Sequence, residues 1–297
     1  MSNICIFIRD GVNYLKSVRQ AGGMGTCLCR EIRETEKEGK NSMMKTLKMK
    51  NRTIGEGRPL VCVPVMEADA AEIIREITYL SQSVADVIEW RVDAFSQFGD
   101  YNAVRGVFDA VAPVLSDKLF LYTFRTKRQG GEADVDAATL NDLHDLAAES
   151  GCVDMVDLEY FEEEKPTRKI RSLKERGVHV VASHHDFEET PSPEVMRMLL
   201  ERMCLGGADI VKLAVMPKTP EDVLDLLSVT SKFHLENPDT PIVTMSMGKL
   251  GNISRLCGET FGSCMTFGAH EKPSAPGQYE MGDLAMILDA IHRSNKR

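Results

Sequence analysis

Eight short runs rich in β-branched and aromatic residues alternate with longer helix-like segments, and this alternation constrains the fold more than any other feature of the sequence. Eight strands that alternate with helices over about 240 residues predict a closed (β/α)8 TIM barrel, a fold of the α/β class. An open doubly wound sheet would carry a glycine-rich phosphate loop after its first strand, and the sequence there is Glu67-Ala68-Asp69. The expected strands are 60–66, 86–93, 119–125, 153–160, 178–186, 209–216, 241–248 and 264–270.

The segments between these runs have the apolar spacing of amphipathic helices. Ile74 and Ile77 predict the buried face of a helix over 71–78, and similar spacing recurs over 223–227. Thr219 followed by Pro220 is the pattern of a helix N-cap with proline at the first helical position. We therefore expect helices in both segments.

The charge is uneven along the 297 residues. Residues 1–50 hold ten Lys/Arg and five Asp/Glu, which gives them a net charge of +5. Since the whole chain has a net charge of −9, the remainder carries −14. An acidic body argues against nucleic acid as a partner. We interpret residues 1–50 as an N-terminal extension that is disordered or stems from a non-native upstream start, with a basic interaction arm as the alternative. Residues 51–297 are then a single (β/α)8 barrel catalytic domain.

The eight cysteines are scattered and form no Cys-x-x-Cys pair. This usage is typical of a reducing compartment and argues against a zinc site. No apolar run approaches the roughly 20 residues that span a membrane, and the N-terminus lacks the pattern of a secretory signal. We therefore expect a cytoplasmic protein that has no membrane partner.

Charged residues occupy one face of several predicted strands. Side chains of a strand alternate between two faces, and the apolar set fits the outer face of a barrel, which packs on helices. The charged set then points inward, where the C-terminal strand ends of this fold hold active sites. For any single strand a structural ion pair is the alternative. The inward set comprises Glu89, Arg91, Asp93, Arg125, Asp157, Glu159 and Lys212.

Lys212 is the one charge in the apolar run 210–216. It is either a solvated edge residue or an amine held away from water for chemistry. A lysine that is removed from water is more easily neutral, and its natural reaction is imine formation with a carbonyl. The charges on the neighbouring strands favour the second interpretation.

The adjacent pair His184 and His185 ends the fifth predicted strand. Histidine is the usual general acid/base near neutral pH, and the pattern alone does not tell which ring points inward. A capping or metal-ligating histidine is the alternative. The neighbouring cations Lys212, Arg91 and Arg125 argue against a divalent ion.

The last two strand-to-helix loops carry residues that are suited to an anion. Loops at these positions of a barrel often bind an anionic group. Arg255, in the loop 251–255, can clamp a carboxylate with its planar guanidinium. Ser274 and Gln278 belong to the Pro/Gly-flanked loop 272–278, which is suited to closing over a substrate, with a plain surface turn as the alternative.

With these residues assembled, the chain resembles the type I 3-dehydroquinate dehydratase family of the shikimate pathway from about Thr53 to His292. The resemblance rests on a series of motifs in one order along the chain. It implies a (β/α)8 barrel, a homodimer and no metal or organic cofactor. The motifs are Glu89-Trp90-Arg91-Val92-Asp93, Phe124-Arg125, Asp157-Leu158-Glu159, His185-Asp186-Phe187, Val211-Lys212-Leu213-Ala214, Met245-Ser246-Met247-Gly248, Ile253-Ser254-Arg255, Phe261-Gly262-Ser263 and Ser274-Ala275-Pro276-Gly277-Gln278.

The resemblance also implies roles for individual residues. Lys212 matches the lysine that forms a Schiff base with the substrate ketone, and His185, rather than His184, matches the general acid/base. Asp157 and Glu159 are expected to support the site. The substrate-contacting positions are matched by Glu89, Arg91, Arg125, Arg255, Ser274 and Gln278, with Arg255 expected at the substrate carboxylate.

One residue departs from the family pattern. Between Arg125 and the Gly-Gly pair 130–131, the family usually has a glutamate that pairs with the catalytic histidine, and this chain has Gln129. An amide still hydrogen-bonds an imidazole, but it cannot stabilise imidazolium by charge. We therefore expect a less basic histidine, and the alternative is that Asp157 or Glu159 takes over the supporting role.

We expect the chain to convert 3-dehydroquinate to 3-dehydroshikimate, a lyase reaction of aromatic amino acid biosynthesis. Loss of water β to a ketone requires removal of a proton α to it, and a protonated imine acidifies that proton because the carbanion becomes a neutral enamine. Three other hypotheses remain: a class I aldolase that uses the same lysine, an inactive barrel that binds a shikimate-like ligand, and a metal-dependent lyase.

Overall fold

The computed structural model describes residues 4–9, 12–17 and 47–296. The chain divides into two units, Met1–Met44 and Lys45–Arg297. In the first unit, strand β1 (Ile4–Arg9) pairs antiparallel with strand β2 (Val12–Ser17). The rest of the predicted extension up to residue 46 lies outside the described residues, so the hypothesis of a disordered or non-native leader stays a prediction.

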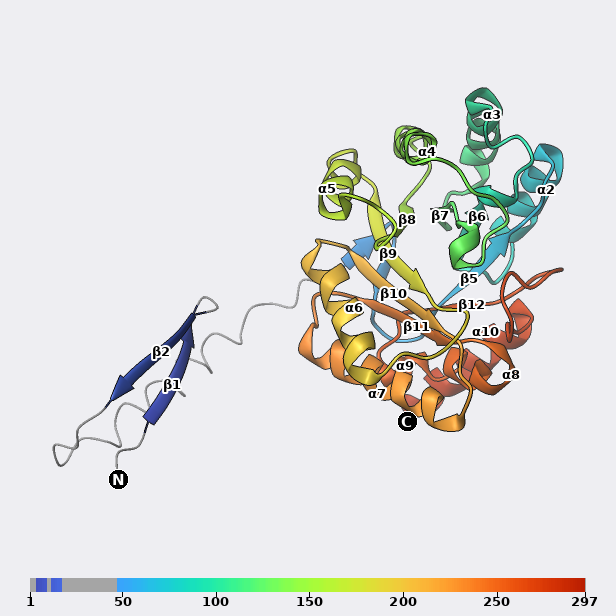
Figure 1. The fold of residues 1–297 in the computed structure, drawn as a ribbon. Helices are drawn as coiled ribbons and strands as arrows, with labels where there is room; N and C mark the ends of the chain where they lie inside the picture. The colour runs from blue at the N-terminus through green and yellow to red at the C-terminus, as the bar shows by residue number, and fades with distance from the viewer. Residues whose placement is uncertain (1–3, 10–11, 18–46, 297) are drawn as a thin grey trace. The chain divides into compact units, whose positions relative to one another are not determined.

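The second unit is a nearly closed barrel of eight parallel strands with helices around it (Figure 1). The two end strands of the sheet, β11 and β12, are joined by a bridge between Ile242 and Ser263 and by a 2.8 Å hydrogen bond from Cys264 N to Ile242 O. The predicted fold is therefore confirmed, and every expected strand is present within its predicted range. In sheet order the strands are β11 (Ile242–Ser246), β10 (Ile210–Val215), β9 (His179–His185), β8 (Met155–Glu159), β7 (Leu119–Thr123), β6 (Val87–Arg91), β5 (Leu60–Val65) and β12 (Met265–Phe267).

Helices follow the strands along the chain and cover the outside of the barrel. None of the described helices is long and apolar enough to cross a membrane. The α-helices are α2 (Ala70–Ser81), α3 (Tyr101–Val111), α4 (Ala137–Glu149), α5 (Pro166–Glu175), α6 (Pro193–Leu205), α7 (Pro220–Glu236), α8 (Gly248–Gly251), α9 (Gly258–Phe261) and α10 (Met281–Asn295). Short 3-10 turns are η1 (Val92–Ala94), η2 (Ala112–Val114), η3 (Lys127–Gln129) and η4 (Asn252–Arg255).

Helices α2 and α7 lie where the sequence predicts helices. Helix α7 begins as expected, because Thr219 and Asp222 form a reciprocal capping box with Pro220 in the first turn. The expected face of α2 is confirmed in part. Ile77 is buried together with Ile73 and Leu80, whereas Ile74 is only partly buried against the core, at the edge of the buried stripe.

A short hairpin, which the sequence did not predict, precedes the barrel. Strands β3 (Leu47–Met49) and β4 (Arg52–Ile54) pair antiparallel, so regular structure begins before the predicted boundary at residue 51. Met49 and Ile54 are buried and pack against Leu60, Val87 and Leu119, which begin three barrel strands. The hairpin therefore covers apolar side chains at the N-terminal end of the barrel.

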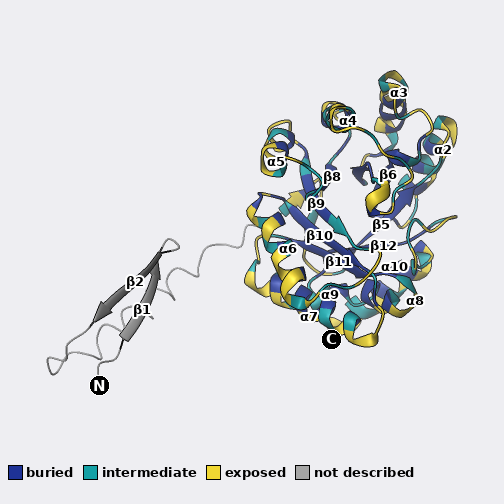
Figure 2. Cartoon of the chain, in the orientation of Figure 1, coloured by how far each residue is buried: buried dark blue, intermediate teal, exposed yellow. Residues whose placement is uncertain are grey.

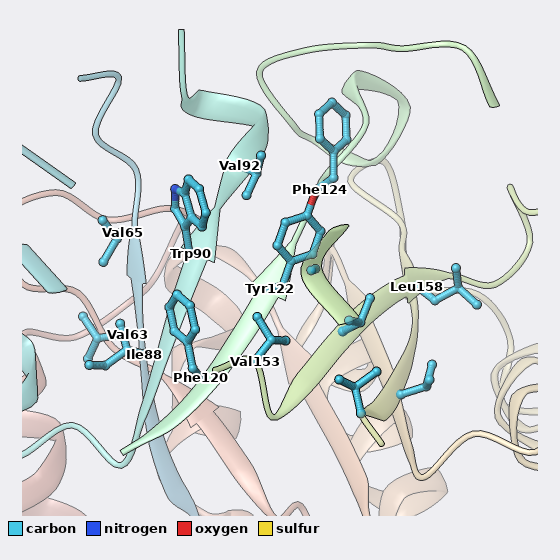
Figure 3. Close-up of a cluster of buried hydrophobic side chains, with 14 of the residues drawn as sticks. Val63, Val65, Ile88, Trp90, Val92, Phe120, Tyr122, Phe124, Val153 and Leu158 are labelled. Atoms are coloured by element: carbon cyan, nitrogen blue, oxygen red, sulfur yellow. The ribbon is translucent and has the colours of Figure 1, made fainter. Parts of the chain in front are cut away.

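The barrel strands are largely buried (Figure 2). Their apolar side chains form two separate sets, as the alternation along each strand predicts. The outer set packs between the strands and the helices, and Figure 3 shows part of it, including Trp90, Phe120 and Tyr122. The inner set fills the barrel and includes Leu121 and Ile210. The charged residues of the same strands alternate with the outer set and therefore share the inner face, as Lys212 does with Ile210.

Candidate active site

A pocket with about 440 Å³ of empty volume lies at the C-terminal ends of the barrel strands. This is the end of the barrel where active sites of this fold lie. Three predicted residues, Asp157, Glu159 and Arg255, are buried and contact residues of the wall or its covering loop without lining the pocket. The predicted residues that line it are Glu89, Arg91, Arg125, Gln129, His185, Lys212, Ser274 and Gln278.

Lys212 projects from the middle of β10 into this pocket and is only 4% exposed. Its Nζ donates a hydrogen bond of 3.1 Å to Asp157 Oδ2 and lies 4.4 Å from the centroid of the Phe267 ring. Both contacts hold the amine inside the barrel, away from its solvated edge. The interpretation of Lys212 as a solvated edge residue is therefore wrong.

Asp157 joins Lys212 to the arginine that follows β7. Its Oδ2 also lies 2.8 Å from Arg125 NH2, and its Oδ1 accepts a 2.6 Å hydrogen bond from Ser183 Oγ. Burial would raise the pKa of this carboxyl, but the charges of Arg125 and Lys212 and the bond from Ser183 outweigh burial and lower the pKa to about 2. Asp157 is thus ionised and divides its negative charge between two cations.

Arg125 is held by a second carboxylate as well. Its NH1 lies 3.0 Å from Glu159 Oε1, and Glu159 also accepts hydrogen bonds from the backbone N–H and the hydroxyl of Thr126. Burial would lower the pKa of Arg125, but Asp157 and Glu159 together raise it. Asp157 and Glu159 are therefore occupied by Arg125, and neither contacts the histidine as the alternative hypothesis required.

The second strand of the barrel contributes a similar pair. Arg91 binds Asp93 in a bidentate manner, with N–O distances of 2.8 and 2.7 Å. Glu89 accepts a 2.8 Å hydrogen bond from Thr123 Oγ1 and does not pair with Arg91. The alternative interpretation, a structural ion pair between Glu89 and Arg91, is therefore wrong, and the Glu89 carboxylate lines the pocket.

The parallel register distinguishes the two adjacent histidines. His185 pairs with Ala214 on the inner face of β10 and lines the pocket, whereas His184 pairs with the outward-facing Leu213. The His184 ring packs edge-on against Phe161 at a centroid distance of 5.3 Å. The structure therefore places His185 at the site.

Gln129, at the end of η3, contacts both the backbone and the ring of His185. Its Oε1 accepts a 2.9 Å hydrogen bond from the backbone N–H of His185 and lies 3.1 Å from Nδ1 of the ring. Burial, together with the positive charges of Arg125 and Lys212, lowers the pKa of His185 well below its ordinary value. His185 is therefore a neutral imidazole at neutral pH.

The glycine after Gln129 is required by this geometry. Gly130 has a φ of +82°, and a Cβ at this position would collide with the ring of Phe187. Phe187 also lines the pocket, two residues beyond His185. Gly130 therefore allows the turn to approach the end of β9 closely.

Arg255 lies deeper than expected. It is 1% exposed, its NH2 donates a 3.1 Å hydrogen bond to Pro276 O, and its NH1 lies 3.7 Å from Met245 Sδ. Its Nε has no hydrogen-bond partner among the described residues, and burial lowers its pKa to about 10. The segment 251–255 forms short helical turns rather than an open loop, with Ser254 Oγ bonded to Gly251 O at 2.7 Å.

The segment 272–278 lies against the pocket as a loop, as expected. Gln278 Oε1 accepts a hydrogen bond of 2.8 Å from Ser274 N, and Gln278 Nε2 donates to Ser274 Oγ at 2.9 Å. Gly248 N donates to Pro276 O at 3.1 Å, which ties the loop to the turn after β11. Both polar side chains are half-buried and available to the pocket.

Sequence reasoning missed several residues of the site. Ser183 links Asp157 to Arg125, donating to the carboxylate and accepting from Arg125 NH1 at 3.1 Å. Its inward position on β9, two residues before His185, was the available signal. The apolar wall, which includes Met245, Phe267 and Phe187, carried no such signal, because buried apolar residues look alike in a sequence.

The described residues contain no group of three or more His, Cys, Asp or Glu side chains that could hold a metal ion. The site instead combines a buried amine, a neutral imidazole and several fixed charges. An amine of this kind can attack a carbonyl, and a neutral imidazole can remove a proton from the adduct. The arrangement is thus suited to chemistry through an imine.

Known proteins match the chain over most of its length. The family model for type I 3-dehydroquinase matches residues 61–295. A 3-dehydroquinate dehydratase from Listeria welshimeri is 43% identical over 251 residues, which cover 84% of this chain and 99% of that protein. One from Bacillus subtilis is 39% identical over 254 residues, which cover 85% of this chain and all of that protein (100%).

Solved structures give the same result. A type I 3-dehydroquinate dehydratase from Clostridium difficile superposes with a TM-score of 0.81 and 39% identity, covering 85% of this chain and 100% of that one. A 3-dehydroquinate dehydratase from Geobacillus kaustophilus has a TM-score of 0.81 and 35% identity, covering 85% of this chain and 98% of that one.

Proposed function

The chain belongs to the type I 3-dehydroquinase family and is therefore a hydro-lyase, and we propose that it dehydrates 3-dehydroquinate to 3-dehydroshikimate through an imine on Lys212. The observation that carries this proposal is the buried Lys212 amine, which shares one pocket with the neutral imidazole of His185. A buried amine next to a base is the pairing that imine-assisted proton removal requires.

The reaction begins when the neutral amine of Lys212 attacks the ketone. The adduct takes up one proton from solvent and loses water to give a protonated imine, and solvent regains that proton when the imine is hydrolysed. His185 then removes the proton α to the imine carbon, and the C–H electrons form an enamine. Asp157, 3.1 Å from Nζ, stabilises the positive charge of the imine, and Arg125 withdraws part of that carboxylate's charge.

His185 next returns its proton to the β hydroxyl, which leaves as water while the enamine electrons form the conjugated double bond. Water then hydrolyses the imine, releasing 3-dehydroshikimate and free Lys212. The same imidazole can serve as base, acid and base again, because each step leaves it ready for the next.

The remaining residues position the substrate. Its carboxylate is assigned to Arg255, because the buried guanidinium has an Nε that is unpartnered among the described residues and its bonds there go to the neutral Pro276 O and Met245 Sδ. The hydroxyl groups are assigned to Glu89, Arg91, Ser274 and Gln278, which line the pocket. Because Arg255 bonds to Pro276, substrate binding is coupled to movement of the loop 272–278.

A place in the shikimate pathway, the homodimer and the cytoplasmic location are further parts of the proposal, supported by family membership. Size-exclusion chromatography with light scattering tests the homodimer directly. A monomer at micromolar concentration would contradict it.

The reaction itself is tested by incubating the purified protein with 3-dehydroquinate and following the conjugated product by its ultraviolet absorbance. We expect turnover that excess chelator does not reduce, and no cleavage of aldol substrates. Binding without turnover would favour the inactive barrel, and loss of turnover in chelator would favour the metal-dependent lyase.

A further inference from the structure

Gln129 holds His185 by two contacts to one oxygen atom. Its Oε1 lies 2.9 Å from the backbone N of His185 and 3.1 Å from Nδ1 of the ring. Gln129 is 2% exposed, so water does not compete for these contacts. The pair therefore behaves as a fixed unit.

The backbone contact identifies which end of the amide faces His185. A backbone N–H can only donate a hydrogen bond, so the amide atom opposite it is the oxygen. The reverse orientation would place the Gln129 NH2 group against this donor. In the present orientation Nε2 has no hydrogen-bond partner among the described residues, so the two contacts at Oε1 outweigh its isolation.

The orientation of the amide determines where the ring proton lies. An amide oxygen only accepts, so Nδ1 of His185 must carry the proton that joins them. Neutral His185 then has an unprotonated Nε2, the nitrogen that does not face Gln129. This nitrogen is the one available to act as a base in the pocket.

The surroundings of His185 disfavour its protonated form. The charged and titratable groups that act on it most strongly are Arg125, Lys212, His184 and Arg91. Three nearby carboxylates are bonded to groups other than His185, and they belong to Glu89, Asp157 and Glu159. An imidazolium therefore has no anionic partner among the described residues.

We propose that Gln129 is a positioning residue that locks His185 in its Nδ1–H tautomer through an uncharged contact, which extends its action as a base to lower pH and makes proton removal the slowest step. This inference rests on the imine mechanism proposed above and concerns one step within it.

The charge balance of that step explains the consequence. Nε2 takes the α proton, and the C–H electron pair becomes the enamine double bond. The imidazolium that forms is costly because the charges that act on it most strongly are cations and its bonded partner is a neutral amide. Its proton then passes readily to the β hydroxyl, which leaves as water. Proton removal therefore has a higher activation barrier than loss of the hydroxyl.

Gln129→Glu tests this with a side chain of the same shape. A carboxylate next to His185 raises the pKa of the imidazole, so the acid limb of kcat/KM should move to higher pH by about 1 to 3 units. With substrate deuterated at the α carbon, the primary isotope effect on kcat should be clearly above one in the wild type and fall toward one in this variant.

Two further variants separate positioning from charge. Gln129→Met removes the acceptor, and we expect kcat to fall by roughly 10²-fold with little change in KM. Arg128→Gln is the matched control, because it also lowers the net charge by one in the same turn. Arg128 is exposed and paired with Glu162 at 2.9 Å, so neither the pH limb nor the isotope effect should move.

Nitrogen-15 NMR of labelled wild-type protein gives a direct reading that does not depend on any variant. We expect a neutral His185 ring protonated at Nδ1; a ring protonated at Nε2 would overturn the inference. An identical pH limb and isotope effect in the wild type and Gln129→Glu would also overturn it. Borohydride trapping at Lys212 distinguishes the two proposals. Absence of trapping in the wild type contradicts the imine. Trapping together with an unchanged acid limb of kcat/KM in Gln129→Glu contradicts only the role of Gln129.

Discussion

The interior of the barrel has two ends that differ in chemistry although the same strands build both. The lower layer, at the N-terminal strand ends, consists of Leu60, Val87, Leu119, Met155 and Ile210 under the β3–β4 hairpin. The upper layer, at the C-terminal ends, consists of Glu89, Arg91, Arg125, Asp157, His185 and Lys212. Ile210 and Lys212 lie two positions apart on one face of β10, so the change occurs within a single strand.

This difference divides stability from chemistry. Apolar side chains in the lower layer gain free energy of folding from burial, roughly 1.5–3 kcal/mol for each large side chain. Buried charges in the upper layer cost desolvation that their pairing only offsets. Substitutions in the lower layer should therefore lower the free energy of unfolding and leave kcat intact. Substitutions in the upper layer should lower kcat, and should lower stability only where they leave a buried charge unpaired.

The largest expected effect is in the upper layer. Lys212→Met should lower kcat by at least about 10⁴-fold, because the nucleophile is lost. The melting temperature should stay equal or rise, since an apolar side chain of similar volume replaces a buried charge and Asp157 keeps Arg125. Steady-state kinetics and calorimetry measure both. Substantial remaining turnover would contradict the division.

Asp157→Asn should affect stability and activity together. Arg125 and Lys212 lose their shared carboxylate, at a cost of about 3–5 kcal/mol in the free energy of unfolding. Since the pKa of Asp157 is lowered from 3.8 to about 2, its stabilisation is present above pH 4 and is lost as pH falls toward 2. Urea unfolding at pH 7 and pH 3 should show the wild-type advantage shrinking at the lower pH. A constant advantage would mean that the ion pairs contribute nothing.

Leu119→Ala, in the lower layer, should lower stability and leave kcat nearly unchanged. Loss of a fully buried leucine costs about 2–5 kcal/mol in the free energy of unfolding. The folded fraction should keep kcat within about twofold, because the site is remote. Denaturant unfolding and kinetics at 25 °C check the two values. A matching collapse of kcat would show that the layers are not independent.

The smallest expected effect lies at the edge of the lower layer. Arg58 pairs with Asp86 at 2.9 Å, but its side chain is 23% exposed and Asp86 is also held by Arg52. Arg58→Gln should therefore cost about 1 kcal/mol or less and leave kcat unchanged. Melting temperatures at low and high salt give this value. A loss as large as that of Leu119→Ala would mean that the hairpin depends on this pair.

Much of this comparison could be predicted from the sequence, because alternation along a strand assigns each residue to a face. Lys212 and Glu89 could be placed inside in this way, and the register later separated His185 from His184. The β3–β4 hairpin could not, since strands of three residues carry too little pattern. The burial of Arg255 behind Pro276 also depends on tertiary packing that no local spacing reveals.

The identity of the reacting amine tests the central claim most directly. Borohydride is added to the protein with and without 3-dehydroquinate, and the digested peptides are analysed by mass spectrometry. We expect inactivation only with substrate, and a reduced adduct on the peptide that contains Lys212. Steady turnover with Lys212 unmodified, or an adduct on another lysine, would contradict the account.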